Sequence, residues 1–525
     1  MDTFRMLHTP ETFVPTKAVV RSSGGIVAAQ HWEAAEAGAA VLRAGGNAVD
    51  AAIATALAIG CVEPWMSGIG GGGYMLIGLA GSKKVYQATY GMIAPKALDP
   101  ARYPLAKEGV APADFLFVWP RVEDDRNVLG PEAVCVPGAV AGFSGVLERF
   151  GTLSWRQAIQ PAISLADKGM PTDWYQTLQI AYGAAAGLGK FSESAKTYLP
   201  DGTPPVSLSS HSPNRIKLGN LSKTLRRLAE AGPEDFYKGK ISELILADLK
   251  NSAFQASDLS DYDAPITEVE GIEYRGKRIH LASGLTAGPT FARALRSIEQ
   301  TIDPNKPLGV DAYVAWADAL KEAYEYRFRV LGHAAPADEL ACTTHLSVVD
   351  REGNMVSLTN TLLERFGSRY MGSETGILFN NGMMWFDPEP GKPNSISAGQ
   401  RPLSNMCPTI VTENGLPVFA CGASGGRRIV PACFQLTSMA VDFGMNLEDI
   451  YSTPRLDVSG TDGAMADARL SSEIIEAVAS KMPIQATFQS IGTRPFANPQ
   501  AVMRKGTENS GAAVIEMATS AAISE

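Results

Sequence analysis

Residues 343–361 contain two short segments rich in β-branched residues, separated by a polar turn. The segments are residues 343–350 and 355–361, and this pattern is typical of a β-hairpin. Glu352 lies midway between Thr343 and Thr361, so strand pairing is expected to bring these two threonines opposite each other. A threonine-rich hairpin at a sheet edge, with no chemical role, has the same pattern.

Apolar periodicity predicts further elements on both sides of this hairpin. Residues 24–30 read as a strand that leads into an Ala-rich amphipathic helix ending near Leu42. A second Ala-rich helix is predicted from Asn47 towards Cys61, with Asn47 as its start signal. The last stretch, about residues 505–525, is rich in Ala and Ser, which predicts a weakly anchored end.

A glycine run at residues 68–73 matches the spacing GxGxxG. A dinucleotide-binding loop needs a strand before this motif and a helix after it. Here a helix is predicted before the run and a strand, residues 74–79, after it. The order excludes a dinucleotide site and favours a tight turn where backbones approach closely.

A second motif, residues 422–426, fits G-x-S-x-G, with a predicted strand before it and a predicted helix at residues 429–441. An α/β-hydrolase would need a catalytic histidine later in the chain, but no histidine follows His345. We therefore expect Gly425 and Gly426 to act through their backbone amides, which can approach an oxyanion closely near a helix N-terminus.

Composition narrows the class of protein. The chain has 525 residues, 45% hydrophobic and 19% charged, with a formal net charge of −9. No basic block is present, which argues against a nucleic-acid partner. No signal-peptide pattern or apolar run of about 20 residues occurs, so no membrane association and a cytoplasmic location are expected. The six cysteines and six histidines lack metal-ligand spacing, so no metal, disulfide framework or cofactor is predicted.

Several motifs, taken in order, resemble the γ-glutamyltranspeptidase family of N-terminal-nucleophile hydrolases. They are Thr343-Thr344-His345, Phe366-Gly367-Ser368, Arg401-Pro402-Leu403-Ser404 and the glycine motif at residues 422–426. The resemblance spans roughly residues 24 to 500. It implies an α+β fold, a four-layer α-β-β-α sandwich with antiparallel sheets. It also implies a precursor that cuts itself between Cys342 and Thr343 into chains 1–342 and 343–525, which stay interlocked as a heterodimer in one domain.

The resemblance also implies roles for individual residues. Thr343 would be the nucleophile, and its freed α-amine, with a pKa of about 7.7–8.0, would be the base. Thr361 would position the nucleophile, and Gly425 and Gly426 would bind the oxyanion. Ser404 and Asn405, matching a serine pair in the family, would bind polar groups of the substrate.

The sequence departs from the family where the family binds a γ-glutamyl group. Gly91 stands in place of the arginine that holds the α-carboxylate, and Gly382 and Trp385 replace the glutamine and aspartate that hold the α-amino group. Leu363 replaces a frequent asparagine. Asp387 is a candidate substitute for the aspartate. Candidate carboxylate-binding arginines are Arg365, Arg369 and Arg427.

These departures favour an autoprocessed N-terminal-threonine amidohydrolase whose acyl group is a small acid other than γ-glutamyl. The pattern resembles the divergent branch that includes oxamate amidohydrolase and cephalosporin-acylase-like proteins. Water or an amine would accept the acyl group, and the heterodimer could dimerise further. One alternative is a γ-glutamyltransferase or glutathione hydrolase with relocated contacts. The non-enzyme alternative is an uncleaved binding protein.

Overall fold

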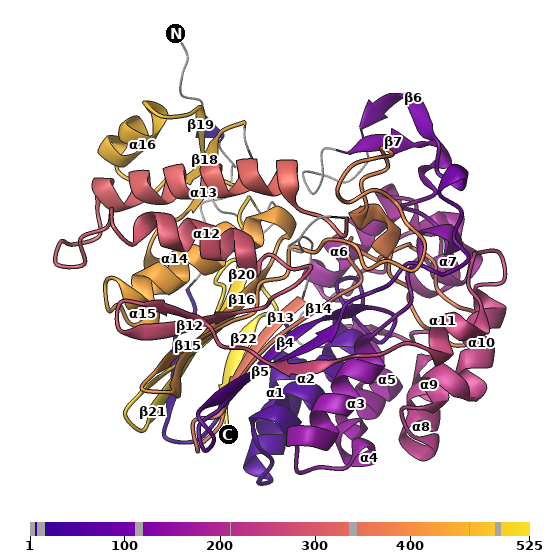
Figure 1. The fold of residues 1–525 in the computed structure, drawn as a ribbon. Coiled ribbons are helices and arrows are strands. Elements are labelled where there is room, and N and C mark those ends of the chain that lie inside the picture. Colours follow the sequence, from indigo (N-terminus) through magenta and orange to yellow (C-terminus); the bar gives the residue numbers. More distant parts are fainter. Residues whose placement is uncertain are drawn as a thin grey trace.

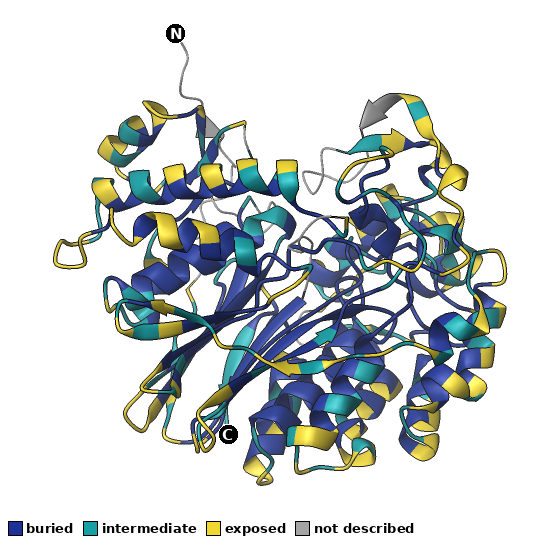
Figure 2. Cartoon of the chain, viewed as in Figure 1, coloured by how far each residue is buried: buried dark blue, intermediate teal, exposed yellow. Residues whose placement is uncertain are grey.

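A computed structural model describes residues 6–7, 16–110, 119–209, 212–334, 344–460, 462–488 and 495–525. Within these residues, two antiparallel sheets stack face to face between two layers of helices (Figure 1). The expected α-β-β-α sandwich is therefore confirmed. Figure 2 shows that the strands are buried and that exposed residues gather on the outer helices and loop tips.

The two main sheets each contain seven strands within the described residues. The first sheet, in spatial order, is β10 (Ile266–Glu268), β5 (Lys84–Tyr90), β4 (Gly72–Leu79), β14 (Met355–Thr361), β13 (Thr344–Val349), β3 (Ile26–Ala29) and β22 (Ala521–Ser524). The second sheet is β11 (Ile272–Tyr274), β12 (Lys277–Leu281), β15 (Thr409–Glu413), β16 (Leu416–Ser424), β20 (Asn498–Lys505), β21 (Glu508–Ala513) and β2 (Val20–Ser22). Both sheets combine strands from before and after the predicted cleavage point.

Helices cover the outer face of each sheet. On the first sheet these are α1 (Trp32–Arg43), α2 (Ala48–Val62) and α3 (Ala139–Phe150), with α5 (Gln160–Lys168) packed on α2 and α8 (Leu221–Ala231) on α5. On the second they are α12 (Gly288–Ile298) and α14 (Ile429–Val441), with α13 (Val310–Val330) packed on α12 and α16 (Ser472–Ala479) on α13. The predicted strand before residues 422–426 and the helix at residues 429–441 are confirmed as β16 and α14.

Smaller elements complete the described chain. The helices are α4 (Trp155–Ala158), α6 (Trp174–Ala185), α7 (Ser192–Tyr198), α9 (Asp235–Lys238), α10 (Lys240–Asp248), α11 (Ala256–Ser260) and α15 (Leu447–Ser452). A four-stranded sheet contains β1 (Met6–Leu7), β19 (Ile484–Thr487), β18 (Ala464–Asp467) and β17 (Leu456–Asp457). Two-stranded ribbons are β6 (Leu105–Val110) with β7 (Pro120–Val122), and β8 (Met170–Pro171) with β9 (Arg215–Ile216).

Helices α1 and α2 form where the Ala-rich pattern predicts them. Asn47 caps α2 by accepting hydrogen bonds from the backbone amides of Val49 and Asp50, and the Asp50 carboxylate accepts from the amide of Asn47. This reciprocal capping box satisfies amides that the first turn leaves without partners. The small side chains let the two helices pack closely, since a methyl group at Gly38 would overlap the Thr55 hydroxyl.

The C-terminal end is the part of the fold that the sequence predicted wrongly. Instead of fraying, β22 pairs with β3 at the edge of the first sheet. Lys17 fixes the approach to this strand, because its ammonium donates to the carbonyl of Val514, at 3.2 Å, and to the carbonyl of Ser520, at 2.8 Å. The anchors are tertiary contacts with residues about 500 positions away, which local composition does not reveal.

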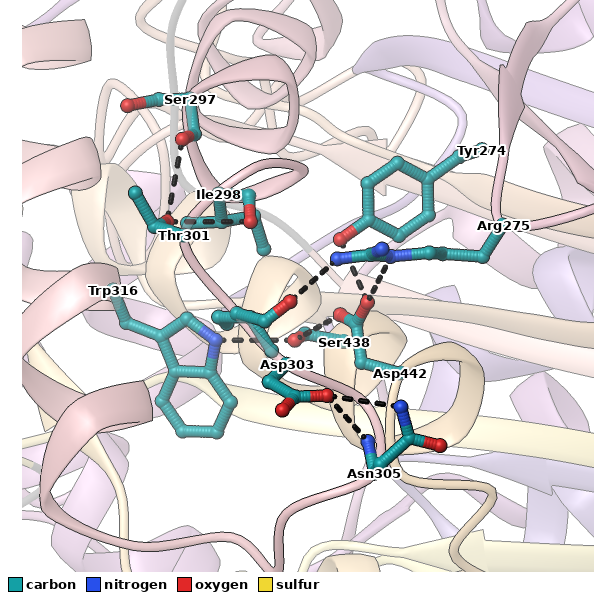
Figure 3. A network of polar contacts seen from close by, with 11 residues as sticks. Tyr274, Arg275, Ser297, Ile298, Thr301, Asp303, Asn305, Trp316, Ser438 and Asp442 are labelled. Atoms are coloured by element: carbon teal, nitrogen blue, oxygen red, sulfur yellow. Dashed lines mark hydrogen bonds and ion pairs between the residues drawn. The ribbon is translucent and has the colours of Figure 1, made fainter.

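A buried polar network fastens the second sheet to its helices (Figure 3). The carboxylate of Asp442 accepts hydrogen bonds from the hydroxyls of Tyr274, at 2.8 Å, and Ser438, at 2.6 Å, and from Nε of Arg275, at 3.2 Å. Ser438 in turn accepts from the indole of Trp316, at 3.1 Å. The buried carboxylate is thus fully paired, as burial of a charge requires.

The contact between the two sheets is partly polar. His345 on β13 lies in this layer, where a methyl group at Gly422 on β16 would overlap its imidazole. Ser357 of β14 also donates to the carbonyl of Cys421, at 2.8 Å. No helix in the described part of the chain is long and apolar enough to cross a membrane.

This close contact predicts the effect of a single methyl group. Gly422→Ala should lower the free energy of unfolding by about 1–3 kcal/mol, because the ring and the facing strand must separate. Gly81→Ala is the matched control, since a methyl group there meets nothing within 4 Å and should change stability by less than about 0.5 kcal/mol. Urea unfolding followed by tryptophan fluorescence measures both, and equal losses would contradict the packing argument.

Candidate active site

The hairpin predicted from the sequence is present with the predicted register. Strands β13 and β14 pair antiparallel from Thr344 opposite Asn360 to Val349 opposite Met355. These pairs are centred on Glu352, as the sequence predicts. The two residues of the predicted cleavage point, Cys342 and Thr343, lie outside the described residues.

The turn of this hairpin is held to the helical layer. The Asp350 carboxylate accepts hydrogen bonds from the backbone amide of Asn354, at 2.8 Å, and from the amide of Ala48 at the start of α2, at 3.0 Å. Strand β13 is therefore fixed at its Val349 end, the end opposite to Thr344.

Thr361 ends β14 and is fully buried. Its hydroxyl accepts a hydrogen bond from the backbone amide of Leu363, at 2.7 Å, and its backbone pairs with Gly72 of β4. Methyl groups at Gly71 and Gly73 would overlap the carbonyl oxygens of Thr361 and Thr359. The glycine run is thus a close approach of two backbones beside the site, as predicted, with α2 before it and β4 after it.

Gly425 and Gly426 lie between β16 and α14, where the backbone leaves the second sheet. Their φ angles are +139° and +63°, in the region that favours glycine. Neither amide donates a hydrogen bond to another residue of the described ranges. Two such amides are suited to bind developing negative charge.

Ser404 and Asn405 are both buried. Arg327 of α13 donates to Oδ1 of Asn405, at 2.6 Å. Because a guanidinium has no acceptor, this bond fixes which way the Asn405 amide points. The Asn405 Nδ2 group has no hydrogen-bond partner in the described chain and remains available as a donor. The sequence did not identify Arg327 as a site residue. It lies on a long helix, where nothing in the local pattern predicts a contact with Asn405.

Tyr74 was also missed by sequence reasoning. This buried residue of β4 pairs with Thr359 in the ladder and forms a side-chain hydrogen bond with Ser404. Its hydroxyl donates to the carbonyl of Leu285, at 3.1 Å. Burial raises the pKa of Tyr74, so the phenol is neutral near pH 7. It joins the first sheet to the segment that carries the candidate substrate-binding pair.

The segment after Thr361 has a strained backbone. Leu363, Phe366 and Arg369 have φ angles of +84°, +60° and +58°, which bulky side chains rarely adopt. Such strain costs on the order of 1–3 kcal/mol per residue and persists where the surroundings enforce it. Leu363 is one of these residues and is nearly fully buried, so the apolar replacement of the family's asparagine is part of the packing.

The region that would receive an α-ammonium group is apolar. Trp385, Phe386 and Leu363 belong to one buried hydrophobic cluster with Leu403. The Asp387 carboxylate accepts from the backbone amide of Glu389, at 2.9 Å, and burial raises the pKa of Asp387. This carboxylate holds a turn in the structure.

The three arginines considered from the sequence have protein contacts. Arg369 forms a buried ion pair with Glu364, at 2.5 Å. Arg365 lies over the ring of Tyr182, at 4.6 Å from its centroid, and Arg427 over the ring of Phe328, at 5.6 Å. Arg369 is therefore committed to the fold, whereas the other two stack on aromatic rings. The described residues contain no cluster of three or more His, Cys, Asp or Glu suited to a metal.

Known proteins resemble this chain over most of its length. The sequence model described as "Gamma-glutamyltranspeptidase" matches residues 34–341 and 331–522. The "Glutathione hydrolase proenzyme" of Pseudomonas sp. (strain A14) is 30% identical, with 91% of this chain and 87% of that protein covered. The "Acylase ACY 1 proenzyme" of Pseudomonas sp. (strain V22) is 31% identical, with 85% of each covered.

A solved structure has the same fold. The cephalosporin acylase from Bacillus halodurans matches with a TM-score of 0.85 and 22% identity, covering 99% of each chain. The four-layer sandwich, with the hairpin at its centre, is therefore the fold class that this chain shares with that acylase. With the family match, the chain belongs to the γ-glutamyltranspeptidase family and is an enzyme of that family.

His345 gives a pH prediction. Burial lowers its pKa to about 3, against an ordinary value of about 6.5 when unfolded. Below pH 6.5 only the unfolded state gains the proton, so stability falls as pH falls towards 3. In His345→Asn, the slope of the unfolding free energy between pH 4.5 and 6 should be smaller by up to about 1.4 kcal/mol per pH unit. Urea unfolding at several pH values checks this, and parallel pH curves for the two proteins would contradict it.

Proposed function

We propose that the chain is a self-cleaving N-terminal-threonine amidohydrolase with Thr343 as its nucleophile. What supports this most is the register of β13 and β14, since the pair that follows Thr344 and Asn360 would be Thr343 with Thr361. Cleavage after Cys342 would give chains 1–342 and 343–525, held as a heterodimer by the two shared sheets. The cytoplasmic location predicted from the sequence is part of the proposal.

In the proposed reaction, the α-amine of Thr343 takes the proton of its hydroxyl, and the hydroxyl oxygen attacks the amide carbonyl. The amides of Gly425 and Gly426 hold the oxyanion, and one such donor is typically worth about 2.7–4 kcal/mol of barrier. Collapse of the intermediate expels the amine, which receives the proton. Water then attacks the acyl-enzyme by the same route and releases the acid, while Thr361 orients the nucleophile.

The substrate we propose is an amide of a small acid without an α-ammonium group, such as oxamate or a related monoamide of a dicarboxylic acid. The support is the apolar cluster around Trp385 and the turn-holding role of Asp387. A buried ammonium without a partner is costly. The alternative, a γ-glutamyltransferase or glutathione hydrolase, is favoured by the 30% identity to a glutathione hydrolase proenzyme.

Self-cleavage predicts two bands on a denaturing gel, of roughly 36 and 19 kDa from the 55.7 kDa chain. Thr343→Ala should leave one full-length band and no activity, because the hydroxyl is lost. Thr343→Ser keeps a hydroxyl beside the same amine and is the matched control, which should still cleave. N-terminal sequencing of the small band should begin at Thr343. A single uncleaved band for the natural chain would favour the binding-protein alternative.

The substrate prediction is tested by comparing glutathione, oxamate and glutaryl-p-nitroanilide in one hydrolysis assay with the processed protein. At least one of the two acids without an ammonium group should have a kcat/KM about 10- to 100-fold above that of glutathione, because pairing with a charged group is worth about 1.5–3 kcal/mol. Turnover of glutathione alone would establish the γ-glutamyl alternative.

A further inference from the structure

Position 91 contains no side chain, and the side chain of Arg401 occupies the space beside it. A methyl group at Gly91 would lie 3.1 Å from Cδ and 3.2 Å from Nε of Arg401, and 3.0 Å from the hydroxyl of Tyr74. Nε of Arg401 donates to the carbonyl of Gly91, at 3.1 Å. The resemblance leads us to expect an arginine at position 91. A guanidinium from another part of the chain, that of Arg401, lies beside this position instead.

The charge of Arg401 is not neutralised by a contact with an acid. No carboxylate of the described residues lies within ion-pair distance of its guanidinium, and Asp263, which acts on it from farther away, is exposed. Its other close neighbours are the hydroxyls of Tyr74 and Tyr262. Burial raises the pKa of Tyr262 to about 12, so this neighbour is neutral near pH 7.

The guanidinium also keeps donors for a ligand. Its Nε donates to the carbonyl of Gly91. The same carbonyl also accepts a hydrogen bond from the hydroxyl of Tyr262, at 2.8 Å. No hydrogen bond joins its two Nη groups to a backbone carbonyl of the described chain. Arg401 is partly exposed. The guanidinium also forms a side-chain hydrogen bond with Tyr262. It has five N–H donors, more than these contacts use, and a planar guanidinium suits a carboxylate.

Arg401 is connected to the candidate active site by short links. It begins the segment that reaches Ser404 and Asn405 three and four residues later. Tyr74, which lies against Gly91, forms a side-chain hydrogen bond with Ser404. Tyr74 is also two residues from Gly72, the ladder partner of Thr361. The same strand therefore contacts both the nucleophile-positioning threonine and the neighbourhood of the guanidinium.

We propose that Arg401 determines specificity by binding a carboxylate on the acyl part of the substrate, with Ser404 and Asn405 as the neighbouring polar groups. The inference rests on the proposed amidohydrolase function and narrows its substrates to monoamides of short dicarboxylic acids. The apolar cluster around Trp385 disfavours an ammonium group, and Arg401 supplies the complementary charge for the acid. Arg369, by contrast, is already neutralised by Glu364.

Two p-nitroanilides that differ in one group test this binding. Glutaryl-p-nitroanilide carries the carboxylate, and pentanoyl-p-nitroanilide has a methyl group in its place. The natural enzyme should prefer the glutaryl compound by about 10- to 100-fold in kcat/KM. Arg401→Met should lose this preference because its kcat/KM for the glutaryl compound falls, while its kcat/KM for the pentanoyl compound stays the same. Arg401→Lys should keep part of the preference, because the charge remains without the bidentate geometry.

Matched controls separate this inference from the proposed function. Arg149→Met removes an arginine that lies over the rings of Tyr86 and Phe150, and it should keep the full preference. Arg401→Met should still cleave itself and hydrolyse the pentanoyl compound, which shows that it folds. An Arg401→Met enzyme that keeps the preference, or a natural enzyme without one, would overturn the role of Arg401 while leaving the hydrolase intact.

Calorimetry gives a readout that does not need turnover. Glutarate should bind the natural protein about 10- to 100-fold more tightly than it binds Arg401→Met, whereas pentanamide, which has no carboxylate, should bind both proteins equally. Equal binding of glutarate to the two proteins would refute the carboxylate site. If glutarate binding depends on Arg401 but the protein neither cleaves itself nor hydrolyses any amide, the proposed function fails and the carboxylate site remains.

Discussion

The antiparallel pairing of β13 with β14 is the constraint on which the rest of the molecule depends. These strands lie at the centre of the first sheet, between β3 and β4, and pack against β16 of the second sheet (Figure 1). A slip of one residue would turn His345 out of the polar layer between the sheets and into the apolar helical layer. The register is therefore fixed by burial on both faces of the hairpin.

The surroundings of this hairpin convert a common supersecondary motif into a site. Glycines of β4 allow its backbone to approach the end of β14, and the glycines after β16 leave two amides without partners in the described chain. The strained segment at residues 363–369 is held by buried packing. Each feature has a local cost, and acyl transfer needs hydrogen-bond donors of this kind near its nucleophile.

Charge placement distinguishes this site from the family pattern. The acidic and amide groups expected around an α-ammonium are replaced by an apolar cluster, and Asp387 holds a turn. Arg401, which belongs to the family-like motif at residues 401–404, lies beside Gly91 where the family arginine is missing, and Arg327 contacts Asn405. The proposed carboxylate substrate is complementary in charge to these cationic groups.

The sequence by itself determined the hairpin and its centre at Glu352, the capped helices α1 and α2, and the order of elements around both glycine motifs. These features depend on local periodicity and turn chemistry, which neighbouring residues encode. Through the resemblance, it also identified the positions where the substrate-binding residues of the family are replaced.

Only the tertiary structure decided which side chains lie beside the positions that differ from the family, Gly91 and Asn405. Arg401 is 310 residues from Gly91, and Arg327 is 78 residues from Asn405. The ordered C-terminal strand likewise depends on pairing with β3 at the other end of the chain. Such contacts arise from packing the two sheets and their helices together, and no local pattern in the sequence specifies them.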